Sequence, residues 1–208
     1  MHGSSKAPIP TLARLATYFR ILDEAQNSGQ KYISSAKIEA ETGISAAQVR
    51  KDLSHFGEMG KPGVGYDVGL LRAHVQKILN LDRPQRVVVI GAGRLGQALA
   101  SYQALAEFGF QVVGIFDSDK RKFGAKAGGH EVQDAAKMPS LLPKLKARMA
   151  ILTVPSSVAQ KAAEAAFAGG IRRFLNFTPA HIQAPPGCLV RDVSFMQEFA
   201  VLAHFTED

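Results

Sequence analysis

The 208-residue chain has one cysteine, Cys188, and no tryptophan. A single cysteine cannot form a disulfide within the chain, which favours a reducing compartment such as the cytoplasm. The chain has no apolar run as long as a membrane span and no signal-peptide pattern at its start, so we expect a cytoplasmic protein without a membrane partner. It has no internal repeat and no low-complexity tract. With 208 residues, the chain is long enough for one large domain or two modest ones.

Basic residues are in moderate excess over acidic ones. The 25 Lys and Arg residues outnumber the 18 Asp and Glu residues, which gives a formal net charge of +7. Hydrophobic residues make up 46% and charged residues 21% of the chain, as is ordinary for a globular protein. The basic balance fits an anionic partner and does not by itself identify one.

The most informative stretch is RVVVIGAGRLGQALA, residues 86–100. The β-branched run at 87–90 predicts a strand of a parallel sheet buried on both faces. Glycines then follow at the G-x-G-x-x-G spacing. The first allows a tight turn, the second lets the backbone approach a pyrophosphate, and the third lets a helix pack closely on the strand. Unpaired N–H groups at the start of that helix face the phosphates. We therefore expect a dinucleotide to contact Gly91, Ala92, Gly93, Arg94, Leu95 and Gly96.

A second strand, QVVGIF at 111–116, ends at Asp117, about twenty residues after the third glycine. At this place the motif requires a carboxylate that accepts hydrogen bonds from the adenosine ribose. Ser118 follows instead of an arginine, and the Asp117 carboxylate would repel a 2′-phosphate. The sequence therefore favours NADH and NAD⁺ as cofactors, although Lys120 and Arg121 leave the phosphorylated forms open.

Strands and helices alternate through the rest of residues 86–193, which predicts an α/β domain with a doubly wound parallel sheet. Strands are expected at 130–133, 149–154, 173–177 and 189–193, and helices at 139–147 and 158–167, the latter capped by Ser156. Ligands of such sheets bind at the carboxyl ends of the strands. We therefore expect further cofactor contacts from Thr153, Val154, Pro155, Asn176, Phe177, Thr178 and Pro179, although these residues are equally compatible with ordinary loops.

The N-terminal third has the pattern of a helix-turn-helix. Helical spacing over 11–27 is followed by a short helix that ends at Gly43. A third helix begins after Ser45, with Gln48 placed for a capping box. Its apolar side carries Val49 and Leu53, and its polar, basic side fits the major groove of DNA. A helix face that is simply exposed to solvent would show the same pattern. The DNA contacts expected from this helix are Ser45, Ala47, Gln48, Arg50, Lys51 and Ser54.

The glycine-rich segment 57–68 predicts a hairpin, which would be the wing of a winged helix with Lys61 near the DNA backbone or minor groove. A helix over 70–81 and a boundary near 82–85 follow. The expected organisation is a DNA-binding domain at 9–81, a Rossmann domain at 86–193 and a C-terminal segment at 194–208.

The C-terminal segment predicts an unusually apolar helix. Ser194 and Gln197 form a capping box for FMQEFAVLAHF, residues 195–205, in which Glu198 is the only acidic or basic residue apart from a histidine. A helix that is apolar on more than one side must be buried. Its own domain covers one face, and a second copy of the chain would cover the other. We therefore expect a homodimer, which also suits DNA with two half-sites.

The assembled chain resembles the Rex family of redox-sensing transcriptional repressors from about residue 9 to residue 205. The resemblance is carried by QVRKDLSHFGEMGKPGVGY, VVVIGAGRLG, IFDSD, LTVP and LNFTP, in the order of the family. It implies a homodimer that binds inverted-repeat operator DNA and is released by NADH, while NAD⁺ competes for the same pocket. It also implies a domain-swapped C-terminal helix that brings Phe199 close to the cofactor of the other subunit.

Three positions depart from the family pattern. His55 stands where tyrosine is frequent, and Pro62 replaces a second basic residue in the wing. Ser194 stands where family members often have an aspartate, so any charged switch at that aspartate is in doubt, although serine caps a helix equally well.

Two other functions compete with this interpretation. An NAD-dependent dehydrogenase needs an acid or base beside the nicotinamide, and only His181 lies in a plausible place. Little chain remains to build a substrate domain. A nucleotide sensor that regulates a protein instead of DNA is the third possibility, and the basic winged helix argues against it.

Overall fold

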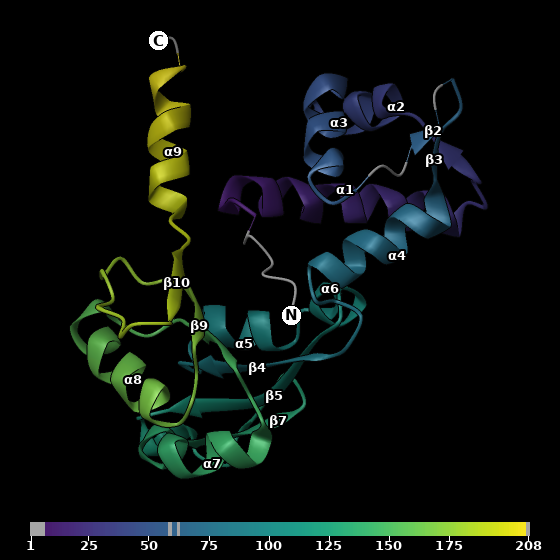
Figure 1. Cartoon of the computed structure of the whole chain (residues 1–208). Coiled ribbons are helices and arrows are strands. Elements are labelled where there is room, and N and C mark those ends of the chain that lie inside the picture. Colours follow the sequence, from purple (N-terminus) through teal and green to yellow (C-terminus); the bar gives the residue numbers. More distant parts are fainter. Residues whose placement is uncertain (1–6, 58–59, 62, 207–208) are drawn as a thin grey trace. The chain divides into compact units, whose positions relative to one another are not determined.

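A computed structural model describes residues 7–57, 60–61 and 63–206 of the chain. The chain divides into two compact units, residues 1–83 and residues 84–208. The helices and strands of both are labelled in Figure 1. Within the described residues, no helix combines the length and the apolar character that crossing a bilayer requires.

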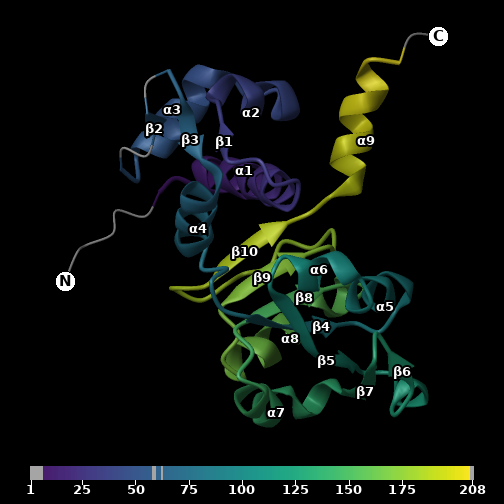
Figure 2. The ribbon, with the colours of Figure 1, turned by 90° about the vertical axis from the view of Figure 1, so that its right-hand side faces the viewer.

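The first unit is a small helical domain with a three-stranded sheet (Figure 2). Its core is built from buried side chains of the helices, such as Leu15, Val49 and Val75. Gly43 joins the second and third helices with a positive φ of 70°, a conformation that glycine adopts without strain. This turn confirms the predicted helix-turn-helix. The elements are α1 (Ile9–Asn27), β1 (Tyr32–Ile33), α2 (Ser35–Thr42), α3 (Ala46–Ser54), β2 (Gly60–Lys61), β3 (Gly65–Asp67) and α4 (Val68–Ile78).

The predicted wing is present as the antiparallel pair β2 and β3, to which β1 adds a third strand. Gly60 lies against the ring of Tyr66, and a Cβ at this position would stand 2.9 Å from the ring. The wing therefore needs its glycine for close packing. Pro62, one of the departures from the family pattern, lies outside the described residues. The following helix begins at Val68 instead of residue 70, because the Asp67 carboxylate accepts a hydrogen bond from the Leu70 N–H and caps it there.

The second unit is a seven-stranded sheet in the order β10-β9-β8-β4-β5-β7-β6. All neighbours are parallel except β6, which pairs antiparallel with β7 at one edge. The strands are β4 (Gln85–Ile90), β5 (Phe110–Asp117), β6 (Lys126–Ala127), β7 (His130–Asp134), β8 (Met149–Leu152), β9 (Arg173–Asn176) and β10 (Leu189–Asp192). The helices are α5 (Arg94–Ala100), α6 (Gln103–Glu107), α7 (Met138–Leu145), α8 (Ser156–Ala168) and α9 (Phe195–His204), with short 3₁₀ turns η1 (Lys120–Lys122) and η2 (Ala135–Lys137).

Helices cover both faces of this sheet because its central strand is apolar on both sides. Val88 and Ile90 of β4 point to the face that packs on α7 and α8, whereas Val87 and Val89 point to the face that packs on α5 and α6. The two-residue period of the strand produces this division. The doubly wound Rossmann architecture predicted from the sequence is therefore confirmed.

Three local features differ from the sequence-based expectations. The short α6 and the edge strand β6 were not predicted, since five and two residues are too short to show a period. Ser156 does not cap α8; it is the first helical residue, and the preceding Pro155 occupies the capping position without a side-chain hydrogen bond.

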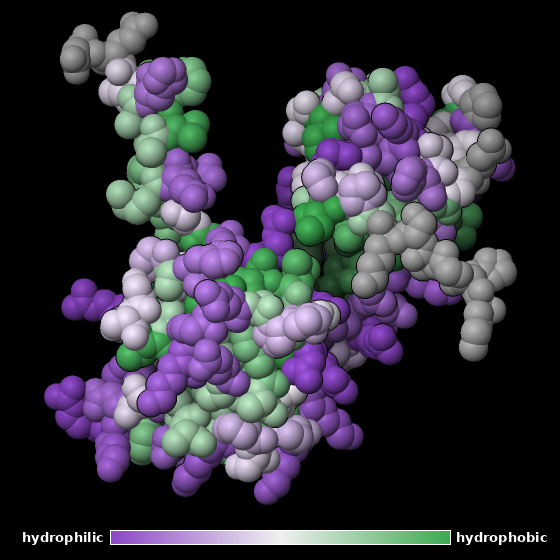
Figure 3. Space-filling model, turned by 60° about the vertical axis from the view of Figure 1, so that its left-hand side comes forward, coloured by the Kyte–Doolittle hydropathy of each residue, from purple (hydrophilic) through white to green (hydrophobic). Residues whose placement is uncertain are grey.

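The C-terminal helix α9 begins as predicted, because the Ser194 hydroxyl accepts a hydrogen bond from the Gln197 N–H. None of its side chains is buried. The exposed fractions of Met196 and Phe199 are 76% and 65%, and that of Phe205, directly after the helix, is 76%. In Figure 3, green apolar surface extends along the column that ends at the grey C-terminal residues. Within a single chain, every side chain of α9 is thus exposed, and the expectation that its own domain covers one face of the helix is wrong.

Candidate nucleotide site and nucleic-acid interface

The glycine turn after β4 has the geometry of a phosphate cradle. Gly91 has a φ of 106°, which only glycine adopts readily. A Cβ on Gly96 would lie 1.8 Å from the carbonyl oxygen of Gly91, so this glycine is required for α5 to pack on the turn. A Cβ on Gly93 would meet nothing within 4 Å. The space beside Gly93 is therefore open, as the approach of a pyrophosphate requires. Arg94 and Leu95 are exposed in the first turn of α5, and Ala92 is buried.

Thr153 fastens this turn to the neighbouring strand. It follows β8, and its hydroxyl lies 3.1 Å from the Ile90 carbonyl oxygen and 3.0 Å from that of Gly91. Its backbone N–H also donates to the Ile90 carbonyl at 2.8 Å. The structure thus brings together Thr153 and the glycine turn, which the sequence assigned to one site from the rule for parallel sheets.

Asp117 at the end of β5 is 8% exposed and accepts three hydrogen bonds. Its Oδ2 accepts from the Ala92 N–H and from the Lys122 ammonium, and its Oδ1 accepts from the Asp119 N–H, each at 2.8 Å. Burial alone would raise the pKa of Asp117, but these donors outweigh it and hold the pKa below its ordinary value. The carboxylate is therefore charged at neutral pH and fixed beside the glycine turn.

A cavity of about 370 Å³ opens next to Asp117. Apolar residues of β4 and α8 line it together with a few polar side chains, a composition that suits a nucleotide base. Together with the open space at Gly93, it shows that the residues present fit an adenine dinucleotide. Its lining includes Ile90, Ser118, Asp134, Val154, Val158 and Lys161.

The segment after β9 is held by its own polar side chains. Asn176 is fully buried, and its amide nitrogen donates to the Ala180 carbonyl and to the Asp192 carboxylate. Its amide oxygen accepts from the N–H and the hydroxyl of Thr178. Because all these groups already have partners, Asn176 and Thr178 shape the loop. Phe177 is half-buried against the core on the α5 and α6 side of the sheet, and Pro179 is exposed.

Phe199, the remaining residue of the expected cofactor site, is exposed on α9. The ring contact between α9 and the expected site is made instead by Phe195, whose centroid is 6.2 Å from that of Phe177. Pro155, also expected at the site, is exposed directly before α8.

The face of α3 predicted to meet DNA is largely exposed. Ala47, Arg50, Lys51 and Ser54 lie on this face, and the Ser45 hydroxyl caps the helix by accepting from the Gln48 N–H at 3.3 Å. Gln48 differs from the expectation. It is half-buried at the edge of the face, and its amide donates to Asp52 at 2.8 Å instead of completing a capping box.

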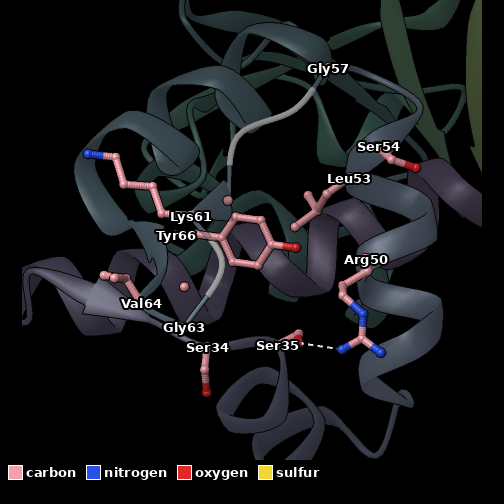
Figure 4. Close-up of a pocket in the computed structure, with 12 residues that line it drawn as sticks. Ser34, Ser35, Arg50, Leu53, Ser54, Gly57, Lys61, Gly63, Val64 and Tyr66 are labelled. Atoms are coloured by element: carbon pink, nitrogen blue, oxygen red, sulfur yellow. Dashed lines mark hydrogen bonds between the residues drawn. The ribbon is translucent and has the colours of Figure 1, made fainter.

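A groove of about 730 Å³ separates α3 from the wing (Figure 4). Arg50 lies on one side and donates from Nη1 to the hydroxyl of Ser35 at 2.9 Å, while Lys61 lies on the wing. Tyr66 is packed in the groove, where burial raises its pKa against the opposing effect of Arg50. Ser34 and Ser35, at the start of α2, also line the groove. Neither serine was expected at this groove, since nothing in the local sequence pattern places them beside α3.

Asp52 of α3 was also missed. This carboxylate is 3% exposed and lies between α3 and α1, where it accepts hydrogen bonds from Arg14, from the hydroxyl of Tyr18 and from Gln48. Its position three residues after the buried Val49 was the available signal, because residues three apart share a helix face.

Two family models match the two parts of the chain. One is described as a putative DNA-binding protein N-terminus and matches residues 6–54, and the other is a CoA-binding domain that matches residues 82–180. The solved structures that match include that of RSP in complex with β-NAD⁺ and operator DNA, at 33% identity and a TM-score of 0.89, covering 95% of this chain and 91% of that one. RSP in complex with β-NADH matches at 32% identity and a TM-score of 0.85, with 97% and 94% covered.

Curated relatives match over nearly the whole chain. The redox-sensing transcriptional repressor Rex of Pelotomaculum thermopropionicum is 40% identical over 197 residues, which cover 95% of this chain and 92% of the relative. The Rex protein of Chloroflexus aggregans is 36% identical over 206 residues, with 99% and 96% covered. The match runs through both units and carries the helix-turn-helix, the wing and the glycine turn together. The chain therefore belongs to the Rex family of redox-sensing transcriptional repressors.

Proposed function

We propose that this repressor binds operator DNA through α3 and the wing as a homodimer, and that NADH bound at the glycine turn releases it. The observation that carries the proposal is the joining of an exposed basic helix-turn-helix to a preformed dinucleotide cradle in one chain. The protein is a regulator and not an enzyme, which sets aside the dehydrogenase alternative. The DNA-binding domain spans residues 9–81, the nucleotide-binding domain 86–193, and the dimer-forming segment 194–208.

At the DNA, α3 enters the major groove. Arg50 and Lys51 are the exposed cations of this helix, and they meet base edges or phosphates. Ser45, Ala47 and Ser54 line the same face, while Lys61 approaches the backbone from the wing. Gln48 acts mainly by holding Asp52, because its amide is already bonded there.

At the cofactor, residues 91–96 surround the pyrophosphate, and Asp117 accepts hydrogen bonds from the adenosine ribose. Val154 lines the adjacent cavity, Thr153 fastens their loop to the glycine turn, and Pro155 ends this loop before α8. Asn176 and Thr178 hold the next loop in shape, with Phe177 half-buried and Pro179 exposed beside them. The bound nicotinamide supplies a ring whose charge and shape differ between NAD⁺ and NADH.

The dimer forms through α9, whose apolar side chains have no cover in the single chain. Each α9 packs on the partner subunit and brings Phe199 close to the partner's cofactor. Because the protein acts on operator DNA, we place it in the cytoplasm. Two α3 helices in one dimer then match two half-sites about one turn of DNA apart.

Release follows from linkage. NADH favours a dimer geometry in which the two α3 helices no longer match consecutive major grooves, so it binds the DNA-free form more tightly. A coupling free energy of about 1–3 kcal/mol weakens operator binding roughly 5- to 150-fold, and DNA weakens NADH binding by the same factor.

Substitution at Gly93 tests the assignment of the two sites. Gly93→Val fills the open space beside the turn, whereas its backbone φ of −79° suits any residue. We expect NADH binding to fall by at least tenfold, while operator binding in the absence of nucleotide stays within twofold of wild type. Ala98→Val, on the exposed side of the same helix, is the matched control, and it should leave both NADH binding and operator binding at the wild-type level. A Gly93→Val protein that NADH still releases from operator DNA would place the nucleotide elsewhere.

A further inference from the structure

Three arginines form a row at the edge of the large sheet that lies opposite the glycine turn. Arg86 lies at the start of β4, and Arg148 and Arg172 directly precede β8 and β9. The strand register aligns the residues that follow these three, and the Arg172 N–H donates to the Arg148 carbonyl at 3.1 Å. Because neighbouring strands are about 4.8 Å apart, the row is roughly 10 Å long.

Two of these guanidinium groups are held in place by carbonyl groups at helix ends. Arg86 Nη1 donates to the Leu145 carbonyl at the end of α7 at 3.0 Å, and Arg172 Nη1 donates to the Phe167 carbonyl near the end of α8 at 2.9 Å. Each side chain thus lies at the negative end of a helix dipole. Among the described residues, only Nη1 of each group has an acceptor, so Nε and Nη2 remain for an acceptor outside the chain.

Three further cations extend this row. Lys144 and Lys146 lie on either side of Leu145 at the end of α7, and Arg173 is the first residue of β9. All six cations are exposed, and no ion pair between described residues involves any of them. We call this set the basic edge: Arg86, Lys144, Lys146, Arg148, Arg172 and Arg173.

The acidic residues of the helices that end near the basic edge do not neutralise it. Glu107 lies on α6, which covers the opposite face of the sheet from α7 and α8. Glu164 lies on α8 one turn before its end, and its carboxylate accepts a hydrogen bond from the amide of Gln160. The basic edge therefore has an excess of positive charge, whose field attracts polyanions.

The shape and composition of the basic edge indicate DNA as the polyanion. None of its residues lines either cavity described above, so it is an open surface instead of a small-molecule site. Arginine forks match phosphate oxygens, and one strand of duplex DNA has a phosphate about every 3.4 Å of helix axis, so about three phosphates face the row. A protein interface would have an apolar centre with aromatic side chains, which residues 144–148 and 172–173 lack.

We propose that the basic edge is a second DNA-binding surface, which holds duplex DNA outside the operator through its phosphates and reads no base sequence. It belongs to the second unit and is separate from α3 and the wing of the first. Phosphate contacts release counterions, so this surface makes the binding of long DNA more dependent on salt. The inference rests on DNA binding by the repressor and does not depend on release by NADH.

The test is fluorescence anisotropy of the full-length protein without nucleotide, over a series of salt concentrations. One labelled duplex is long and lacks the inverted repeat, and the other is trimmed to the inverted repeat. The edge variant combines Lys144→Gln, Lys146→Asn and Arg148→Gln, because these side chains make no hydrogen bond in the structure and asparagine suits the positive φ of residue 146. The control variant removes three exposed charges elsewhere on the same unit, by Lys120→Gln, Lys126→Gln and Lys137→Gln. A thermal melt of each shows that it is folded, and Arg148→Gln alone replaces the edge variant if that one unfolds.

We expect the edge variant to bind the long duplex at least fivefold more weakly than wild type and the trimmed operator within twofold of it. The slope of log affinity against log salt on the long duplex should become shallower by about 2 to 3, since each lost phosphate contact removes about 0.9. The control variant should remain near wild type on both duplexes.

An unchanged affinity of the edge variant for the long duplex would show that α3 and the wing alone bind such DNA, and would overturn the proposal. An equal loss in the control variant would overturn it too, because the effect would then come from net charge. If the edge variant binds the long duplex as wild type does but no longer binds polyglutamate, the basic edge takes an acidic protein instead of DNA. A wild type that binds the long duplex but not the operator would contradict the proposed function and leave the basic edge supported.

Discussion

Arg14 of α1 binds the buried carboxylate of Asp52 on α3 at two points. Its Nε is 2.6 Å from Oδ2, and its Nη2 is 2.7 Å from Oδ1. Such a two-point bond fixes both the distance and the rotation between two planar groups. The helix that we assign to the major groove is thus held against α1 by an ion pair in addition to its apolar side chains.

Breaking this ion pair should destabilise the first unit. Asp52→Ala leaves Arg14 and the hydroxyl of Tyr18 without their acceptor in a largely buried place, which we expect to lower the free energy of unfolding by about 3 kcal/mol. Chemical denaturation followed by circular dichroism measures it. Glu24→Gln, which breaks the exposed pair with Arg20, is the control and should cost less than about 0.5 kcal/mol. Equal effects of the two substitutions would show that the ion pair between Arg14 and Asp52 does not stabilise the first unit.

The same carboxylate makes part of the stability depend on pH. Burial raises the pKa of Asp52, but the donors Arg14, Tyr18 and Gln48 prevail and hold it below the ordinary value. A depressed folded-state pKa contributes stability that is complete above the unfolded-state pKa of about 4 and is lost as the pH falls through the folded-state value. The difference in unfolding free energy between wild type and Asp52→Asn should therefore shrink from pH 7 to pH 3. A difference that stays constant over this range would show that the ionised form is not favoured by folding.

Adding a methyl group should lower the free energy of unfolding at Gly96 but leave it almost unchanged at Gly93. A Cβ on Gly96 would collide with the Gly91 backbone, so Gly96→Ala has to move α5 away from β4 and should cost about 3 kcal/mol. Gly93→Ala meets open space and should leave the unfolding free energy within about 0.5 kcal/mol of wild type. Thermal or urea unfolding of the two variants side by side checks this. Equal stability of both would mean that α5 does not pack on the turn as described.

A charge on α9 should separate the subunits without unfolding them. Phe199 is 65% exposed in the single chain, so Phe199→Glu costs nothing there but places a carboxylate in the proposed dimer contact. We expect a monomer in sedimentation at micromolar concentration, with operator binding weakened at least tenfold. Glu198→Gln on the same helix is the control and should remain dimeric. If Phe199→Glu sediments as a dimer, α9 is not the contact between subunits.

Much of the fold could be predicted from local patterns. The four β-branched residues 87–90, the spacing of the three glycines and the helix caps at Ser45 and Ser194 each act within a few residues, and the structure confirms them. Elements too short to show a period, such as α6 and β6, could not be found in this way. The start of α8 was misplaced because proline and serine both occur at helix starts, and only the backbone geometry decides between them.

A residue of the candidate site could be predicted where a sequence motif assigns its function. It could not be predicted where its function depends on contacts that only the fold creates. Asp117 follows from its distance to Gly96 along the chain. Lys122 does not, since the sequence alone offers three adjacent cations and only the turn of η1 brings one of them to the carboxylate. Gln48 shows the reverse case. Its place on a helix face suggested a DNA contact, whereas the partner that engages its amide is the buried Asp52.

We expect the binding of operator DNA to depend on whether the bound nucleotide is NADH or NAD⁺. Fluorescence anisotropy of a labelled inverted-repeat operator, at fixed salt, measures it directly as NADH or NAD⁺ is added. We predict that NADH lowers operator affinity roughly 5- to 150-fold and that the same concentration of NAD⁺ does not. Operator binding that is indifferent to both nucleotides, or lost equally with both, would contradict redox control by this protein.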